Sequence, residues 1–219
     1  MKIKLLTNYN YGATVEGAAA EKLKDILLKS IPNDIIGQIT IAPNVTLPAQ
    51  PVRDIDLAVW GNLSNCVLPY FYKDETAESP KDLQVNDFFL VIELKGHPAD
   101  KVYCQDSHLF AKYADEGKDA TVQNENQRLS MLHYLKINDI NISVSNALWF
   151  NSIDKDELFK ITSNRNLGAL PSVFTFKDLI TTIIGQGQKP TCDLFNDRYV
   201  LSAGIDSEKI NAYILKLFK

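Results

Sequence analysis

The segment Phe88–Gly96 constrains the fold of this chain more than any other stretch. It runs Phe-Phe-Leu-Val-Ile-Glu-Leu-Lys-Gly, so a continuous apolar run ends abruptly in charged residues. The apolar run predicts a buried strand. Because successive side chains of a strand point to opposite faces, Glu93 and Lys95 share one face, and Ile92 and Leu94 share the other. Burying the two charges without partners would cost several kcal/mol, so they form either a structural ion pair or a site that holds a further group such as a cation.

The overall composition favours one main core and no membrane segment. The chain has 219 residues, of which 45% are hydrophobic, and this is enough for a large core. Its net charge of -4 argues against indiscriminate coating of nucleic acid but leaves room for a local basic groove. The three cysteines are scattered without a C-x-x-C spacing, which indicates neither a disulfide framework nor a zinc ribbon and fits a reducing compartment. Since no apolar run is long enough to cross a bilayer, we expect a cytoplasmic protein with no membrane contact.

Hydrophobic periodicity along residues 1–150 predicts helices that alternate with strands. Thr14 can cap a helix over 15–30. This order predicts a mixed α/β sheet flanked by helices, with residues 61–86 as a solvated insertion. The other expected elements are strands over 35–41 and 53–60, the strand of Phe88–Gly96, a hairpin from 101–104 and 108–113, a helix over 120–136 and a strand over 140–150.

Polar side chains recur at regular positions in two of these elements. In the strand over 53–60, alternation places Asp54 and Asp56 on the face opposite to the apolar residues. In the helix over 120–136, Gln123 and Gln127 lie one turn apart. The side chains of this helix that we expect to pack inward, on a neighbouring face, are Val122, Leu129, Leu132 and Leu135.

The remainder of the chain, residues 151–219, has a different pattern. We expect a loop around 164–171, a helix over about 175–184 and a final amphipathic helix over 206–218. The chain is therefore expected to divide into a core over 1–150 and a small helical appendage or connector.

Four short motifs carry the polar residues of the core. They are V-E-G at 15–17, R-D-I-D at 53–56, V-I-E-L-K-G at 91–96 and N-E-N-Q at 124–127. In this arrangement residues 12–150 resemble the nuclease-related domain (NERD) family, which belongs to the PD-(D/E)xK superfamily of restriction-endonuclease-like proteins. The proline that precedes the superfamily's aspartate is missing here, so either Asp54 or Asp56 can correspond to that aspartate. The Ile-Asp pair favours Asp56.

The resemblance implies a restriction-endonuclease-like fold and a Mg²⁺-dependent nuclease, with Mn²⁺ able to substitute, that hydrolyses phosphodiester bonds in DNA. It also implies that Asp56 and Glu93 are metal ligands, joined by the Leu94 carbonyl, and that Glu16 is an accessory ligand. Apart from the family, Mg²⁺ prefers carboxylate and carbonyl oxygens and stabilises the charge that develops on a phosphate. NERD proteins often occur joined to helicase or kinase domains, so a fused or associated module of that kind is an expected partner.

By the same resemblance, Lys95 would position or activate the attacking water, and Gln127 would steady the nucleophile or the substrate phosphate. A lysine beside two carboxylates can hold hydroxide or offset the negative charge of the transition state. His97 is either a substrate contact or an ordinary turn histidine. The alternative function is a catalytically inactive nuclease-fold module that binds nucleic acid or a protein partner.

Three tyrosines could stack on the bases of a nucleic acid. They are Tyr9, Tyr11 and Tyr113. Because the sequence around them has no interleaved basic pattern, we expect them to pack at loop edges instead.

Overall fold

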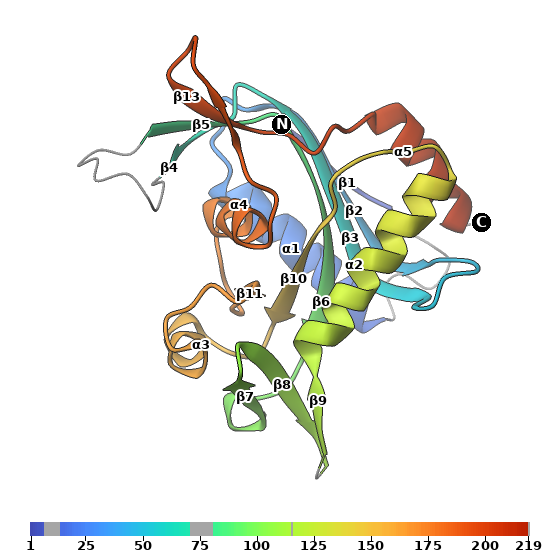
Figure 1. Ribbon diagram of the computed structural model, residues 1–219, viewed down its shortest axis with the longest axis vertical. Coiled ribbons are helices and arrows are strands. Elements are labelled where there is room, and N and C mark those ends of the chain that lie inside the picture. The colour runs from blue at the N-terminus through green and yellow to red at the C-terminus, as the bar shows by residue number, and fades with distance from the viewer. Residues whose placement is uncertain (7–13, 71–80, 115, 219) are drawn as a thin grey trace.

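A six-stranded mixed sheet forms the centre of the protein in a computed structural model that describes residues 1–6, 14–70, 81–114 and 116–218 (Figure 1). β3 (Asp54–Ser64) is antiparallel to both of its neighbours, whereas the other three pairs of strands are parallel. The strand expected over 140–150 begins only at residue 145. In spatial order the strands are β1 (Lys2–Leu5), β2 (Ile36–Thr46), β3 (Asp54–Ser64), β6 (Asp87–Lys95), β10 (Ser145–Phe150) and β11 (Ala169–Leu170).

The strand expected over Phe88–Gly96 is confirmed as β6, which lies in the interior of the sheet. Ile92 packs into the core on one face, and Val91 packs into the core on the other. Glu93 and Lys95 continue the row of Val91, as strand alternation requires. The two charged side chains therefore extend from the same face of a strand that is buried on both sides.

Helices cover both faces of the sheet, which confirms a mixed α/β fold (Figure 1). α1 (Val15–Ser30) and α4 (Phe176–Gly185) contribute to the core on one face, and α2 (Ala120–Ile137) and α5 (Ser207–Ile214) to the core on the other. α1 begins where expected, because the Gly17 N–H donates a hydrogen bond to Thr14 Oγ1 at 3.0 Å. Within the described ranges, none of the helices combines the length and apolar character that spanning a membrane requires.

Helix α2 turns polar side chains toward the sheet over part of its length, and the sequence pattern was wrong for two of the four residues expected inside; Leu132 and Leu135 do pack against the core. Val122 and Leu129 were expected inside but have 43% and 47% of their surface exposed. Asn124 and Gln127 are buried instead, together with Leu135, which was expected inside. The reason is that β6 ends in two buried charges beneath this helix, and buried charges need hydrogen-bond partners.

A four-stranded sheet includes part of the segment expected as a solvated insertion. Leu83 and Val85 of this segment belong to the main core, so the expectation is wrong for the described part of residues 61–86. Most of the charged residues that motivated it lie within 71–80, outside the described residues. In spatial order the strands of this sheet are β12 (Thr191–Asp193), β13 (Arg198–Leu201), β5 (Lys81–Val85) and β4 (Val67–Tyr70).

A three-stranded sheet lies beside the start of α2 and the end of β6 (Figure 1). It confirms the hairpin expected over 101–113 as β7 (Val102–Gln105) and β8 (His108–Tyr113), and β9 (Glu116–Asp119) adds a third antiparallel strand. Asp119 at the end of β9 caps α2, because its Oδ1 accepts the Val122 N–H at 2.9 Å. This small sheet thus fixes where α2 begins relative to β6.

Residues 151–219 are built into the same cores and do not form the expected helical appendage. Phe176 and Leu179 of α4 pack in the core with α1, and Ile210 and Ile214 of α5 pack in the core with α2. β11 joins the six-stranded sheet beside β10, and β13 joins the four-stranded sheet beside β5, which is distant in the sequence, so local periodicity cannot indicate this second pairing. The remaining elements are α3 (Lys155–Thr162) and the short 3₁₀ helices η2 (Ala99–Lys101) and η3 (Leu215–Phe218).

Candidate active site

Two carboxylates come together at the ends of neighbouring strands. Leu57 of β3 pairs with Ile92 of antiparallel β6, so Asp56 and Glu93, the next residues outward, lie beside one another. The Leu94 N–H donates a hydrogen bond to Asp56 Oδ2 at 2.7 Å and holds this carboxyl group against β6. The pairing of the two strands therefore creates an acidic pair from residues that are far apart in the sequence.

Glu93 accepts three hydrogen bonds from charged or amide donors. Lys95 Nζ and Gln123 Nε2 donate to Oε1 at 2.7 and 2.6 Å, and Gln127 Nε2 donates to Oε2 at 2.5 Å. Glu93 and Lys95 are only 4% and 2% exposed. A buried ion pair is tolerated when its remaining hydrogen-bonding capacity is satisfied, and these contacts meet that condition on the Glu93 side.

Two glutamines of α2 support the pair. Gln123 and Gln127 lie one turn apart on the face toward β6, which is why both amides reach Glu93. Gln127 Nε2 also donates to the Asp54 carbonyl at 3.1 Å, whereas Gln127 Oε1 is buried and has no partner in the part of the chain that is described. The motifs identified Gln127 but not Gln123. The one-turn spacing of Gln123 from Gln127 was the feature of the sequence that could have identified Gln123 as a site residue.

Tyr113 at the end of β8 closes over Lys95. Lys95 Nζ donates to Gln123 Oε1 at 3.0 Å and to the Tyr113 hydroxyl at 3.4 Å. The Tyr113 ring meets the His97 ring edge-to-face, with 4.4 Å between centroids. Burial and the nearby Lys95 charge lower the pKa of His97. Tyr9 and Tyr11 lie outside the described residues.

Asp56 has a strongly raised pKa. Burial is the largest cause, and the negative charge of Glu93 is the next, while the hydrogen bond from the Leu94 amide acts in the opposite direction. Together with a hydrogen bond to Glu93 and the more distant charge of Glu16, these effects raise the pKa of Asp56 from 3.8 to about 7. Near neutral pH, and without a bound cation, Asp56 therefore still holds its proton in a large fraction of the molecules.

We predict that stability falls as the pH rises through this window. Between about pH 4 and pH 7 the folded protein holds a proton on Asp56 that the unfolded chain has released, so each step toward higher pH favours unfolding. The Asp56→Asn variant lacks this titration. As the pH rises from 4 to 8, the difference in unfolding free energy between this variant and wild type should change by about 2–4 kcal/mol in favour of the variant. Urea denaturation in EDTA measures both values. Parallel pH profiles for the two proteins would contradict the prediction.

Asp54 and Glu16 lie outside the acidic pair. The Asp54 side chain is exposed and accepts a 3.4 Å hydrogen bond from Thr46 Oγ1, so of the two aspartates Asp56 is the one beside Glu93. Glu16 is half-buried in the first turn of α1 and acts on Asp56 through its charge. Within the described residues, no three Asp, Glu, His or Cys side chains form a group that could hold a metal ion.

The donors that are present nevertheless fit Mg²⁺. This ion is commonly held by one or two carboxylates and keeps several of its waters, so it needs no cage of three protein side chains. Asp56 and Glu93 supply two carboxylates, and Gln127 Oε1 adds a buried carbonyl-type oxygen whose hydrogen-bonding capacity is unused. The set is rich in oxygen, which is the chemistry that a hard divalent cation requires.

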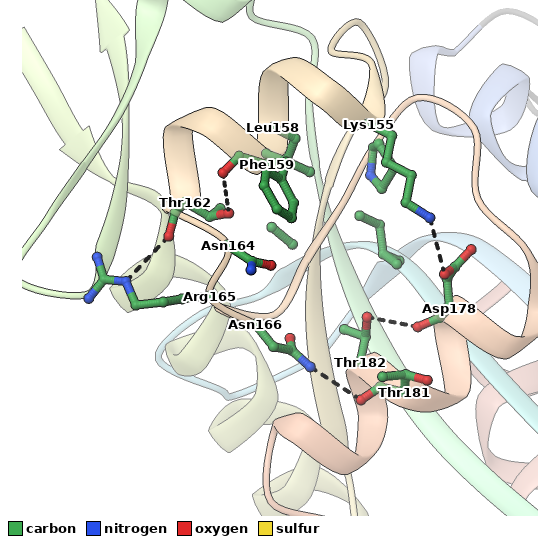
Figure 2. Close-up of a pocket in the computed structure, with 13 residues that line it drawn as sticks. Lys155, Leu158, Phe159, Thr162, Asn164, Arg165, Asn166, Asp178, Thr181 and Thr182 are labelled. Carbon is green, nitrogen blue, oxygen red and sulfur yellow. Dashed lines mark hydrogen bonds and ion pairs between the residues drawn. The ribbon is translucent and has the colours of Figure 1, made fainter. Parts of the chain in front are cut away.

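A separate cavity of about 340 Å³ lies between α3, α4 and the loop that joins α3 to β11 (Figure 2). Its charged lining residues are Lys155, Arg165 and Asp178, and Lys155 pairs with Asp178 at 3.8 Å. Arg165 donates from Nε to the Thr162 carbonyl at 3.3 Å, and its other two nitrogens donate to Ser107 Oγ and Cys104 Sγ of the β7–β8 hairpin at 3.0 and 3.3 Å. The cavity shares no lining residue with the acidic pair, so it is not part of the candidate active site.

Comparisons with models of protein families, with curated proteins and with solved structures found no match for this chain. The chemistry of the site therefore has to be argued from its own residues.

Proposed function

We propose that the protein is a metal-dependent nuclease with a restriction-endonuclease-like core of the NERD type, and that it hydrolyses phosphodiester bonds in DNA. One observation carries the proposal: Asp56 and Glu93 lie together at the ends of β3 and β6, with the Lys95 ammonium 2.7 Å from Glu93. Two carboxylates and a lysine at one point are the groups that metal-assisted phosphoryl hydrolysis uses.

Each residue has a distinct role in this proposal. Asp56 and Glu93, with the Leu94 carbonyl, would hold Mg²⁺ or Mn²⁺, and Glu16 would contribute negative charge as an accessory ligand. The ion, when bound, would supply stabilisation of the charge that develops on the phosphate. Gln127 would orient Glu93 through its amide and steady the region of the nucleophile.

Lys95 would orient or activate the attacking water. Its three N–H groups are directed to Glu93 Oε1, Gln123 Oε1 and the Tyr113 hydroxyl, and the longest of these contacts, 3.4 Å to Tyr113, is the one that a water or phosphate oxygen would replace. A preorganised positive charge at the place where negative charge develops is often a large contribution to catalysis. Because Lys95 is 2% exposed, the water and phosphate must approach it past Tyr113 and Gln123.

Cleavage assays test this function directly. Purified protein is incubated with supercoiled plasmid and with single-stranded DNA, in Mg²⁺, Mn²⁺ or EDTA. We expect cleavage with either metal and none in EDTA. The absence of cleavage under every metal condition would count against the nuclease.

The alternative is a module that binds nucleic acid or a protein partner without cutting. It is favoured by one observation, the near-complete burial of the paired Glu93 and Lys95, which is also expected of a purely structural ion pair. Retention of DNA without cleavage in the same assays would support this alternative.

A further inference from the structure

Tyr113 connects the solvent to the buried centre of the candidate site. Forty per cent of its surface is exposed, whereas its hydroxyl lies 3.4 Å from Lys95 Nζ. The centre of its ring lies 5.9 Å from the same nitrogen. Since Lys95 itself is almost fully buried, a group bound next to Lys95 would contact the Tyr113 ring as well.

Two further side chains surround this ring. Lys118 of β9 holds its ammonium 5.0 Å from the ring centroid, and His97 contacts the ring edge-to-face at 4.4 Å. No ion pair in the described part of the chain involves Lys118, so its charge is available to an anion. An aromatic ring flanked by an unpaired ammonium is the combination that binds a nucleobase together with its phosphate. Lys112 precedes Tyr113 in the sequence but holds its ammonium over the Tyr103 ring, so the ammonium beside Tyr113 is supplied by Lys118 of the next strand.

We propose that Tyr113, His97 and Lys118 form a subsite for an unpaired nucleotide beside the scissile phosphate, so that single-stranded nucleic acid is the preferred substrate. This inference rests on the proposed nuclease function and specifies its substrate class. Every base has a face that can stack on an aromatic ring, so the subsite reads no particular sequence. In a duplex those faces are covered by neighbouring bases, and only an unpaired base can offer one to Tyr113.

The charge balance of the protein indicates that stacking outweighs ionic attraction. The net charge is -4, and the subsite contributes one available ammonium, that of Lys118. Each phosphate contact to a single strand adds about 0.7 to the slope of log affinity against log salt concentration. The salt dependence of binding should therefore be shallow, and Lys118→Gln should reduce the slope by about 0.7.

Binding measurements separate the subsite from catalysis. Fluorescence anisotropy reports the affinity for a labelled single-stranded oligonucleotide and for the same sequence as a duplex, both in EDTA and with Ca²⁺. We expect tighter binding of the single strand and a loss of about ten- to a hundredfold in Tyr113→Ala. Tyr113→Phe keeps the ring and should keep the affinity, even though it loses the contact with Lys95.

Tyr103 provides a matched control on the same small sheet. Its ring also has an ammonium nearby, because Lys112 Nζ lies 5.4 Å from the ring centroid. Tyr103 pairs with Phe110 of β8, and both side chains lie on the face of the sheet opposite to that of Tyr113. Tyr103→Ala should leave the affinity for the single strand unchanged. An equal loss in Tyr103→Ala and Tyr113→Ala would overturn the subsite, because it would show a general effect on the sheet.

Cleavage kinetics then distinguish failure of the subsite from failure of the nuclease. If the subsite is correct, Tyr113→Ala raises KM for single-stranded DNA more than it lowers kcat, and Tyr113→Phe restores KM. Metal-dependent cleavage with the same KM in Tyr113→Ala and wild type would overturn the subsite and leave the nuclease standing. Binding that depends on Tyr113 without any cleavage would keep the subsite and remove the nuclease. Tighter binding of the duplex, or no binding at all, would overturn the subsite.

Discussion

Replacing Lys95 by methionine is expected to slow metal-dependent cleavage about a hundred- to a thousandfold, which is the usual loss when one preorganised electrostatic group is removed from an active site. Methionine keeps an unbranched apolar side chain of similar length, with sulfur in place of one methylene, and removes the ammonium. Glu93 still accepts hydrogen bonds from the neutral amides of Gln123 and Gln127 in this variant but loses its opposite charge, so the variant is also expected to be less stable than wild type. The measurement is the initial rate of cleavage under saturating Mg²⁺.

The exposed Lys101 of η2 provides the control for the loss of a positive charge. Lys101→Met should cut at the wild-type rate, and the melting temperatures of both variants show whether each remains folded. If Lys95→Met is folded and cuts as fast as wild type, Lys95 has no part in catalysis.

Replacing Glu93 by glutamine is expected to destabilise the protein by about 3–5 kcal/mol, because it leaves Lys95 as a buried charge without an opposite charge at hydrogen-bonding distance. Its remaining hydrogen-bond acceptors, Gln123 Oε1 and the Tyr113 hydroxyl, are neutral groups. Urea denaturation at neutral pH in EDTA measures the loss. For this reason a failure of Glu93→Gln to cut DNA would by itself say little about catalysis.

The double variant Glu93→Gln, Lys95→Met should recover most of the lost stability, because it no longer buries a single charge. Glu125→Gln is the control, since Glu125 and Arg128, both on α2, form an ion pair that is more exposed than the pair of Glu93 and Lys95. Glu125→Gln should lower the unfolding free energy by no more than about 1 kcal/mol. If Glu93→Gln lowers the unfolding free energy no more than Glu125→Gln does, Glu93 and Lys95 do not form the buried ion pair on which this prediction depends.

Much of the local structure could be predicted from the sequence. The apolar run before Glu93 identified the buried strand, and strand alternation correctly placed Glu93 and Lys95 on one face. Thr14 marked the start of α1, because a side-chain cap needs only the residues that follow it. These features depend on a few neighbouring residues, and that is the range over which a sequence pattern is informative.

Only part of the interior face of α2 could be predicted in the same way, because Leu132 and Leu135 pack inward as expected but Val122 and Leu129 do not. Apolar spacing favoured Val122 and Leu129, but the helix buries Gln127 because the sheet beneath it offers Glu93 as an acceptor. A helix pattern does not reveal which surface the helix will meet. The same limit applies to β13 within residues 151–219, because it pairs with β5, which lies far away in the chain.

The sequence by itself determined that a carboxylate and a lysine extend from one face of a buried strand, because the period of a strand is a local property of the backbone. The family resemblance favoured Asp56 as their neighbour, but only the tertiary structure decided between Asp54 and Asp56 and placed Tyr113 over Lys95. Both contacts depend on pairing and packing between segments that are distant in the sequence. The raised pKa of Asp56 has the same origin, because burial and the charge of Glu93 arise only when β3 and β6 come together.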